Sequence, residues 1–335
     1  MINNIAATIS SWGKYIFGGL ITLLCLVIFF RQVNFGDLLD SLAHFQWPYL
    51  FLGALSLAAG YSLRIARWSM MLRASSANAT FSNCSAPFLA SIALNNVLPL
   101  RLGDVLRALV FPKSMGISKT AATSSLIVER LIDLMTLVTS LAIGLYAVQA
   151  VAIPEKIKIS ALYLALIGGI LLSLGFLYSG PLGNFFTRIA KKLSNPTPLK
   201  KLYTAGGELL LQFNMMSRPK LLGSMLCISM FIWAGEAGLF YFILLGTGIH
   251  GSPAVALLVM SVATLSTLAP SSPGYVGPFH LAAYTAISLV GGSDAQAGSY
   301  AVIAHLSVWL PTTLAGAVAI WCRPELFRAV KSQTT

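Results

Sequence analysis

The sequence predicts an all-α polytopic membrane protein, and two observations lead to that fold class. Hydrophobic residues make up 56% of the 335 residues, charged residues only 10%, and the mean hydropathy is +0.79. These values lie outside the usual range of soluble domains. The apolar runs are also long enough to cross a bilayer as helices, which takes about 20 residues, and they lack the alternation of β-barrel strands.

Six segments are predicted to cross the membrane as full helices. They cover residues 15–30, 48–63, 121–148, 159–178, 221–246 and 297–321. The first run has the apolar character of a signal peptide, but Arg31 and Gln32 follow it without a small-residue cleavage pattern. We therefore expect it to be retained as the first helix.

Two further apolar segments, 84–111 and 253–290, are broken near their middles by "NNVLPLRLG" and "APSSPGYVGP". Each flanking arm has about 10 to 17 residues, too few to span comfortably but enough to enter and return. Both are predicted to be re-entrant helical hairpins, with two interfacial loops as the alternative that stays open. Prolines remove amide donors and glycines permit close backbone approach. The predicted break residues are Pro99, Gly103, Pro270, Pro273 and Gly277.

The basic residues predict the orientation. In this layout most of the 22 lysines and arginines, Arg64 and Arg67 among them, fall on the side of the N-terminus. The positive-inside rule then places both termini of this multi-pass protein in the cytoplasm. We expect the membrane to be the bacterial inner membrane. A full crossing at 84–111 would put the stretch 113–119 on the wrong side, so the charge pattern favours a hairpin there.

The two halves of the chain, residues 1–150 and 151–335, have the same order of helix, helix, hairpin and helix. Three crossings in each half would leave the halves upside down to one another, an inverted repeat typical of transporters. Between them, residues 181–218 are predicted to form an amphipathic cytoplasmic segment whose basic face suits an anionic leaflet. Charge that only sets topology is the alternative for this segment.

Charged groups inside a membrane are costly, so each one is a functional candidate. In "SSLIVERLIDLM", Glu129 and Asp133 share a helix face, and Arg130 is predicted to pair with Asp133 or with the first hairpin.

Within that hairpin, Arg101, Asp104 and Arg107 follow one another at three-residue spacing and leave one net positive charge. An arginine can hold phosphate at two points, which favours an anionic head group. A structural lock from Arg101 or Arg107 to Glu129 or Asp133 is compatible with that interpretation and stays open.

Other polar residues complete the predicted site. Glu236, in "FIWAGEAGLF", is a candidate for proton coupling or for contact with a cationic group, or only for a hydrogen bond to a neighbouring helix. His280 and His305 are candidates for titration or substrate contact, or packing residues. The predicted substrate-binding residues are Asn96, Arg101, Asp104, Arg107, Glu129, Arg130, Asp133, Glu236, Ser271, Ser272, Gly274 and His280.

No metal site or cofactor is expected, because the four cysteines are far apart and form no CxxC pair. The formal charge of +12 would suggest nucleic acid in a soluble protein. Here the orientation accounts for it, so no nucleic-acid partner is expected.

Three motifs in order, "NNVLPLRLGDVLRA", "ERLID" and "PSSPGYVG", resemble the flippase-like membrane region of lysylphosphatidylglycerol synthases and the stand-alone proteins built from it. The resemblance covers nearly the whole chain and implies movement of a lipid between leaflets. In bifunctional members a cytosolic synthetase domain makes the aminoacyl-lipid. We expect a stand-alone member, because the sequence ends about a dozen residues after the last predicted helix.

The motif match implies a set of family residues and two departures from the family pattern. Tyr275 and His280 stand near places where the family often has a second glycine and a glutamate, which weakens the expectation of a cationic aminoacyl-lipid. The implied family residues are Asn96, Pro99, Arg101, Gly103, Asp104, Arg107, Glu129, Arg130, Asp133, Pro273, Gly274 and Gly277.

The leading hypothesis is a lipid translocase for an anionic phospholipid or a polyprenyl-phosphate-linked lipid. Without a GxxxxGK[ST] motif the chain is not expected to hydrolyse ATP, so transport would be downhill or ion-coupled, with Glu129 and Glu236 as residues to test. An enzyme is not expected; a membrane transferase and a scaffold for a lipid or glycan synthase are the alternatives. A partner synthase and a homo-oligomer stay open.

Overall fold

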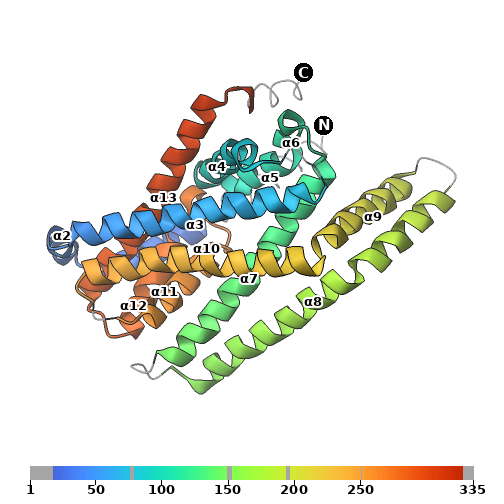
Figure 1. Ribbon diagram of the computed structural model, residues 1–335. Helices are drawn as coiled ribbons and strands as arrows, with labels where there is room; N and C mark the ends of the chain where they lie inside the picture. Colours follow the sequence, from blue (N-terminus) through green and yellow to red (C-terminus); the bar gives the residue numbers. More distant parts are fainter. Residues whose placement is uncertain (1–17, 76–78, 149–152, 194–196, 250, 327–335) are drawn as a thin grey trace, which may run out of the picture.

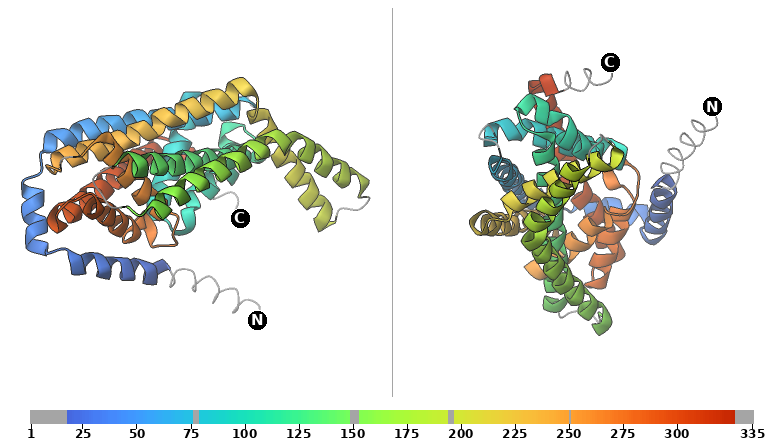
Figure 2. Two further views of the ribbon diagram at one scale, coloured as in Figure 1. Left: turned by 90° about the horizontal axis from the view of Figure 1, so that it is seen from below. Right: turned by 90° about the vertical axis from the view of Figure 1, so that its right-hand side faces the viewer.

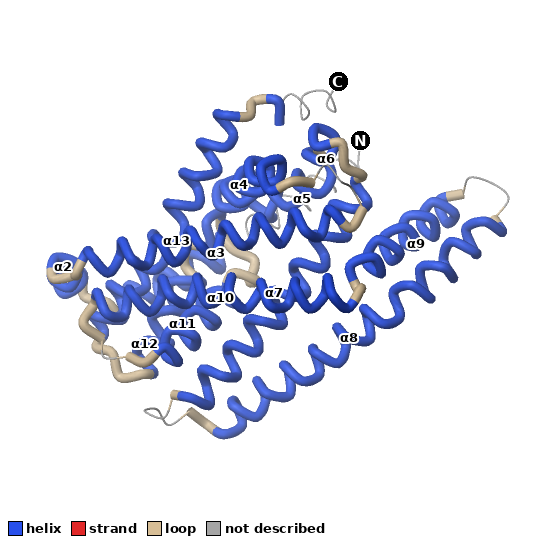
Figure 3. The backbone as a smooth tube through the Cα atoms, in the orientation of Figure 1, coloured by secondary structure: helices blue, strands red, loops and turns tan. Residues whose placement is uncertain are grey.

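The computed structural model describes residues 18–75, 79–148, 153–193, 197–249 and 251–326, and every regular element in these ranges is a helix (Figures 1 and 3). The predicted all-α class is therefore confirmed. The predicted start of the first helix at residue 15 and the C-terminus beyond residue 326 lie outside the described residues.

The first half of the chain begins with the helix Gly18–Gln32, which bends by 80° into α2. In the left view of Figure 2, α2 stands across one end of the molecule and joins this helix to α3. The elements that follow are α2 (Phe35–Ala43), α3 (Trp47–Arg73), α4 (Phe81–Val97), the 3-10 turn η1 (Pro99–Arg101), α5 (Leu102–Leu109), α6 (Phe111–Met115) and α7 (Lys119–Ala147).

The second half begins with a helix of 38 residues, and α9 folds back along it (Figure 1). Its elements are α8 (Glu155–Lys192), α9 (Pro198–Met216), α10 (Pro219–Gly246), α11 (Pro253–Ser266), the 3-10 turn η2 (Pro273–Tyr275), α12 (Pro278–Leu289) and α13 (Asp294–Cys322).

Local sequence signals account for the helix starts. The side chains of Ser118, Thr197 and Ser293 each accept a hydrogen bond from a backbone N–H in the first turn of α7, α9 and α13. Prolines begin α10, α11 and α12, where the missing N–H needs no partner.

The length and composition of the helices make this a multi-pass membrane protein. Among the described residues, α3, α8, α10 and α13 are each long and apolar enough to cross a bilayer, and the bent pair Gly18–Gln32 and α2 would add a fifth crossing. At 29 residues, α7 has the length, but Glu129, Arg130 and Asp133 lower its hydropathy. Four or five of the six predicted crossings are thus supported by composition alone.

Two predicted boundaries were wrong. The helix expected over 48–63 continues as α3 to Arg73, so Arg64 and Arg67 lie within a helix and not in a cytoplasmic loop. The helix expected over 159–178 continues as α8 to Lys192, and α9 packs against it. The segment 181–218 is therefore the end of a long helix plus a second helix, and α8 continues through Gly180, Pro181 and Gly183 without ending.

Both broken segments fold back on themselves. The first hairpin consists of α4, η1 and α5, and the second of α11, η2 and α12; within each, the two helices are in contact. In the first, Asn95 of α4 bonds through its amide both to the backbone N–H and to the carboxylate of Asp104 in α5.

The two hairpins pack against the last helix of the opposite half. α4 lies along α13, and α11 lies along α7. Along one face of the molecule α3 and α10 lie side by side (Figures 1 and 2). Gly60 and Gly235 meet there, and an added Cβ on Gly235 would lie 2.9 Å from the carbonyl oxygen of Ser56. Small residues at such crossings let helix backbones approach closely.

Candidate functional site

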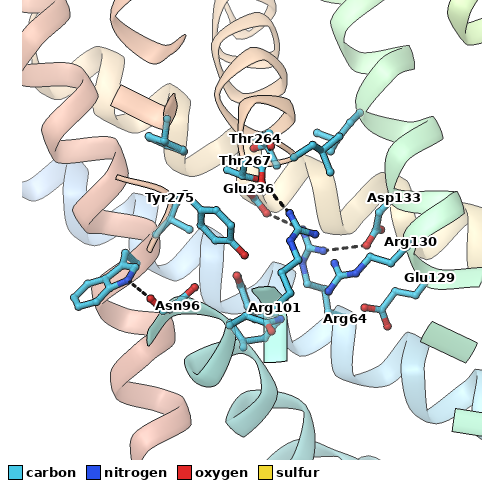
Figure 4. Close-up of a pocket in the computed structure, with 18 of the residues that line it drawn as sticks. Arg64, Asn96, Arg101, Glu129, Arg130, Asp133, Glu236, Thr264, Thr267 and Tyr275 are labelled. Carbon is cyan, nitrogen blue, oxygen red and sulfur yellow. Dashed lines mark hydrogen bonds and ion pairs between the residues drawn. The ribbon is translucent and has the colours of Figure 1, made fainter. Parts of the chain in front are cut away.

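A cavity of about 400 Å³ lies where the tips of the two hairpins meet α3, α7, α10 and α13. Its volume falls within the range of about 300–1,000 Å³ that is usual for small-molecule sites. Aromatic and aliphatic side chains form much of its wall, and charged groups are gathered on one side of it (Figure 4). The charged residues that line it are Arg64, Arg101, Glu129, Arg130, Asp133 and Glu236.

One set of ion pairs joins α3 to α7 and α10. The guanidinium of Arg64 lies 2.7 Å from Glu236 and 3.5 Å from Asp133, and that of Arg67 lies 2.7 Å from Asp133. Asp133 also accepts from the indole N–H of Trp233 at 3.3 Å. These side chains are buried, so their charges are desolvated and each needs its partner.

A second set ties the first hairpin to α7. Arg107 lies 2.7 Å from Glu129 and is 1% exposed. Its guanidinium also stacks over the rings of Phe88 and Trp68, at 4.7 and 5.1 Å from their centroids. Arg130 donates to both oxygens of Asp104 at 2.7 and 2.8 Å, a two-point contact.

The charges of this cluster do not cancel. Among the described residues around the cavity, five arginines face four carboxylates, so one positive charge is in excess. Arg101 is the arginine without a carboxylate: it donates to the carbonyl oxygen of Thr267 at 3.2 Å and lies 5.5 Å from the ring of Tyr275. Figure 4 shows it reaching from the first hairpin toward the end of α11.

Both hairpin tips have an unusual backbone. In the part of the chain that the structure describes, Leu100, Arg101 and Tyr275 are the non-glycine residues with positive φ, at 59°, 53° and 59°. Such residues cost about 1–3 kcal/mol each and are found most often at functional sites. Arg101 and Tyr275, one from each tip, face each other across the cavity.

Glycines allow the tips to approach their neighbours. A Cβ on Gly103 would overlap the carbonyl oxygen of Ser91, so α5 can lie against α4 at this point only with glycine there. In the second hairpin Gly274 has φ +77°, and an added Cβ would lie 3.1 Å from the indole nitrogen of Trp309. The predicted break residue Gly103 and the predicted binding residue Gly274 thus each have a steric reason to be glycine.

The second hairpin has no ion pair among the described residues, and polar contacts of other kinds hold it. Two involve a charged group: Arg101 donates to the carbonyl oxygen of Thr267, and the hydroxyl of Tyr284 donates to Asp294 at 2.7 Å. The ring nitrogen Nε2 of His305 lies 2.7 Å from the carbonyl oxygen of Gly274, and the rings of His280 and His305 are 4.5 Å apart. The backbone N–H of Ser272 donates at 2.9 Å to the hydroxyl of Thr22, in the first helix.

The structure brings most of the predicted residues to the cavity or to its ion pairs. Asn96 and Gly274 line it, and the amide of Asn96 donates to Thr312 and Thr313 on α13. Asp104 and Arg107 lie behind the lining residues, each in an ion pair. Ser271, Ser272 and His280 do not line the cavity; His305 does.

The structure identifies the partners of two arginines whose pairing the sequence left open. Arg130 pairs with Asp104 of the hairpin rather than with Asp133, and Arg107 pairs with Glu129.

Sequence reasoning missed Arg64, Arg67 and Tyr275 as parts of this cluster. A signal for the first two was present, because no proline or glycine separates Leu63 from Arg73 and the helix therefore had no reason to end at residue 63.

One of three comparisons with known proteins gave a match. A search among curated proteins and a search among solved structures each gave no match. The family model described as the lysylphosphatidylglycerol synthase TM region matches residues 15–316, which include both hairpins and the whole charged cluster. The match spans most of the chain, and this multi-pass membrane protein therefore belongs to the lysylphosphatidylglycerol synthase TM family.

Proposed function

We propose that the protein is a lipid translocase that moves an anionic phospholipid or a polyprenyl-phosphate-linked lipid between leaflets without changing it chemically. The proposal rests on the position of Arg101. This residue supplies the one excess positive charge of the cluster, and it lies where the two hairpin tips meet. A single unpaired arginine in a cavity with aromatic walls suits one phosphodiester, because an arginine contacts two phosphate oxygens at once. Family membership supports a lipid-related role.

The packing of the helices supports an inverted repeat. If the helix Gly18–Gln32, α2, α3, the first hairpin and α7 correspond to α8, α9, α10, the second hairpin and α13, then the contacts of one half recur in the other. α2 contacts α13 as α9 contacts α7, α4 contacts α13 as α11 contacts α7, and α3 contacts its own counterpart α10. In such transporters the substrate site lies near the midplane, between broken helices.

In the proposed topology both termini are cytoplasmic, and the first hairpin enters the membrane from the cytoplasm and the second from outside. Ser114 in α6, which is exposed, tests this. In spheroplasts, a cysteine in place of Ser114 should react with a membrane-impermeant maleimide only after permeabilisation. The native cysteines are first replaced by serine. Labelling from outside would contradict the hairpin.

The transport test uses the pure protein in liposomes with acyl-NBD phosphatidylglycerol or acyl-NBD phosphatidylcholine. Dithionite bleaches the dye in the outer leaflet only, so movement shows as loss of the protected fraction. We expect transport of phosphatidylglycerol to fall about tenfold or more in Arg101→Gln, because the substitution removes about one charge-assisted contact with the lipid. Lys191→Gln, which removes an exposed cation outside the cavity, is the matched control and should transport normally.

The same assay separates the alternatives. Lipid extracts from the liposomes, incubated with candidate group donors, are analysed by mass spectrometry. A modified lipid would favour a transferase. Neither modification nor movement, from protein that remains monodisperse, would favour a scaffold for a synthase. Equal rates in wild type and Arg101→Gln would remove the proposed anion site.

A further inference from the structure

A second cavity, of about 540 Å³, lies apart from the charged one, between the end of α7, the start of α8, and the two helices of the second hairpin. Its wall is almost entirely aliphatic, and it shares no lining residue with the charged cavity. The hydroxyl of Thr285, one of its few polar groups, is satisfied by the carbonyl oxygen of Leu281 at 2.7 Å. Typical lining residues are Leu141, Leu145, Ala161, Leu258 and Leu289.

The cavity opens on the lipid-facing side of α8. Its lining residues Ile157 and Leu164 are 52% and 58% exposed, as is their neighbour Tyr163 at 59%. An apolar surface of this kind in a membrane protein faces hydrocarbon and not water. The natural occupant is therefore a lipid tail and not a water-soluble molecule.

One end of the cavity carries a positive charge. Lys156 lines the rim and is exposed, whereas the neighbouring Lys158 pairs with Glu155 at 3.2 Å. Glu155, Lys156 and Lys158 together carry one net positive charge, which is that of Lys156. From Lys156 to Leu164 the helix rises by about 12 Å. If the phosphate of a lipid lies at Lys156, this length of the cavity accommodates part of its acyl chain. Basic residues at this level attract anionic lipids.

We propose that this cavity binds an acyl chain of a phospholipid with net negative charge, whose head group lies at Lys156, in the leaflet at the end of the molecule where α7 ends and α8 begins. In the proposed topology this is the outer leaflet. The site is distinct from the Arg101 cavity, and its occupation does not depend on transport.

The test uses the full chain in nanodiscs that contain phosphatidylglycerol with a diazirine in its acyl chain, or the same derivative of phosphatidylcholine. After photolysis, labelled peptides are identified by mass spectrometry. We expect the phosphatidylglycerol probe to label the start of α8 and the middle of α11. Ser160→Trp fills the mouth from an exposed position and should lower this labelling about tenfold.

Two further variants sharpen the result. Leu171→Trp adds the same ring on α8 at a residue that is 62% exposed and outside the cavity, and should label as wild type does. Lys156→Gln should lower labelling by phosphatidylglycerol about threefold or more and leave that by phosphatidylcholine unchanged. If Ser160→Trp is not monodisperse, Ala161→Leu fills the cavity from inside.

Labelling spread evenly over the lipid-facing helices, or unchanged by both filling variants, would overturn the site. Equal labelling by the two wild-type probes would overturn the role of Lys156. Arg101→Gln should leave the labelling intact, so a failure of the transport proposal is distinguishable from a failure of this one.

Discussion

The two hairpins occupy corresponding places in the packing, but they are held by different forces. The first is tied to α7 by the buried ion pair of Arg107 with Glu129 and by the partly exposed pair of Asp104 with Arg130. The second makes no ion pair in the described chain and is held by single hydrogen bonds, such as Thr22 with Ser272 and His305 with Gly274. A charged group takes part in two of its contacts, Arg101 with Thr267 and Asp294 with Tyr284. In the described chain, charge is thus gathered on one hairpin and on the helices that face it.

This difference has an energetic meaning. A buried ion that loses its partner is penalised by several kcal/mol, whereas hydrogen bonds between neutral groups in membranes average about 0.6 kcal/mol. The first hairpin is therefore locked to defined partners, and the second is held by weaker contacts. Arg101 lies where they meet, outside the lock.

The largest effect is expected for Arg107→Ala. The substitution leaves Glu129 buried without a counter-ion and removes a cation from the rings of Trp68 and Phe88, so we expect a loss of about 3–5 kcal/mol in the free energy of unfolding. Thermal unfolding in detergent measures it. Arg107→Leu combined with Glu129→Leu should recover much of the loss; a double variant as unstable as the single one would contradict a simple ion-pair lock.

The next effect compares the glycines of the two tips. Gly103→Ala forces a Cβ into the carbonyl oxygen of Ser91 and should cost about 3 kcal/mol. Gly274→Ala introduces strain at φ +77° beside Trp309 and should cost about 1–2 kcal/mol. Denaturant titration in mixed micelles reports both. The reverse order would mean that the second tip is packed more tightly than the first.

A smaller effect is expected for Thr22→Val, which removes the hydroxyl bonded to Ser272. We predict a loss of about 1 kcal/mol, measured by the shift in melting temperature. Thr285→Val is the control, since that hydroxyl bonds only to a carbonyl of its own helix. A loss as large as the loss of about 3–5 kcal/mol expected for Arg107→Ala would show that the second hairpin is also locked.

The smallest effect on stability is expected for Arg101→Gln. Because Arg101 has no carboxylate partner in the described structure, its loss should change the unfolding free energy by less than about 1 kcal/mol, although transport is expected to fall. Melting curves and transport rates of one preparation separate the two quantities. A stability loss as large as that of Arg107→Ala would make Arg101 part of the lock.

Several features were predictable from short stretches of sequence. The hairpin breaks at Pro99 and Pro273 lie at the 3-10 turns η1 and η2, because proline and glycine act on the local backbone. The three motifs also indicated the family, which the family model confirms.

The ion-pair partners were not predictable. Arg64 and Asp133 are far apart in sequence, and their contact depends on how α3 and α7 are placed around α10. The length of α8 was also missed, because amphipathic character after residue 180 suits a surface helix and the end of a long helix equally.

The sequence by itself determined the helical membrane class and the places where the chain breaks, since hydropathy and backbone preference act over a few residues. Only the tertiary structure decided that Arg107 pairs with Glu129 and Arg130 with Asp104, and that Arg101 has no carboxylate partner among the described residues. The pairing of buried charges depends on the register of helices that are distant in the chain. If any of these helices were turned about its axis by one residue, other side chains would face each other.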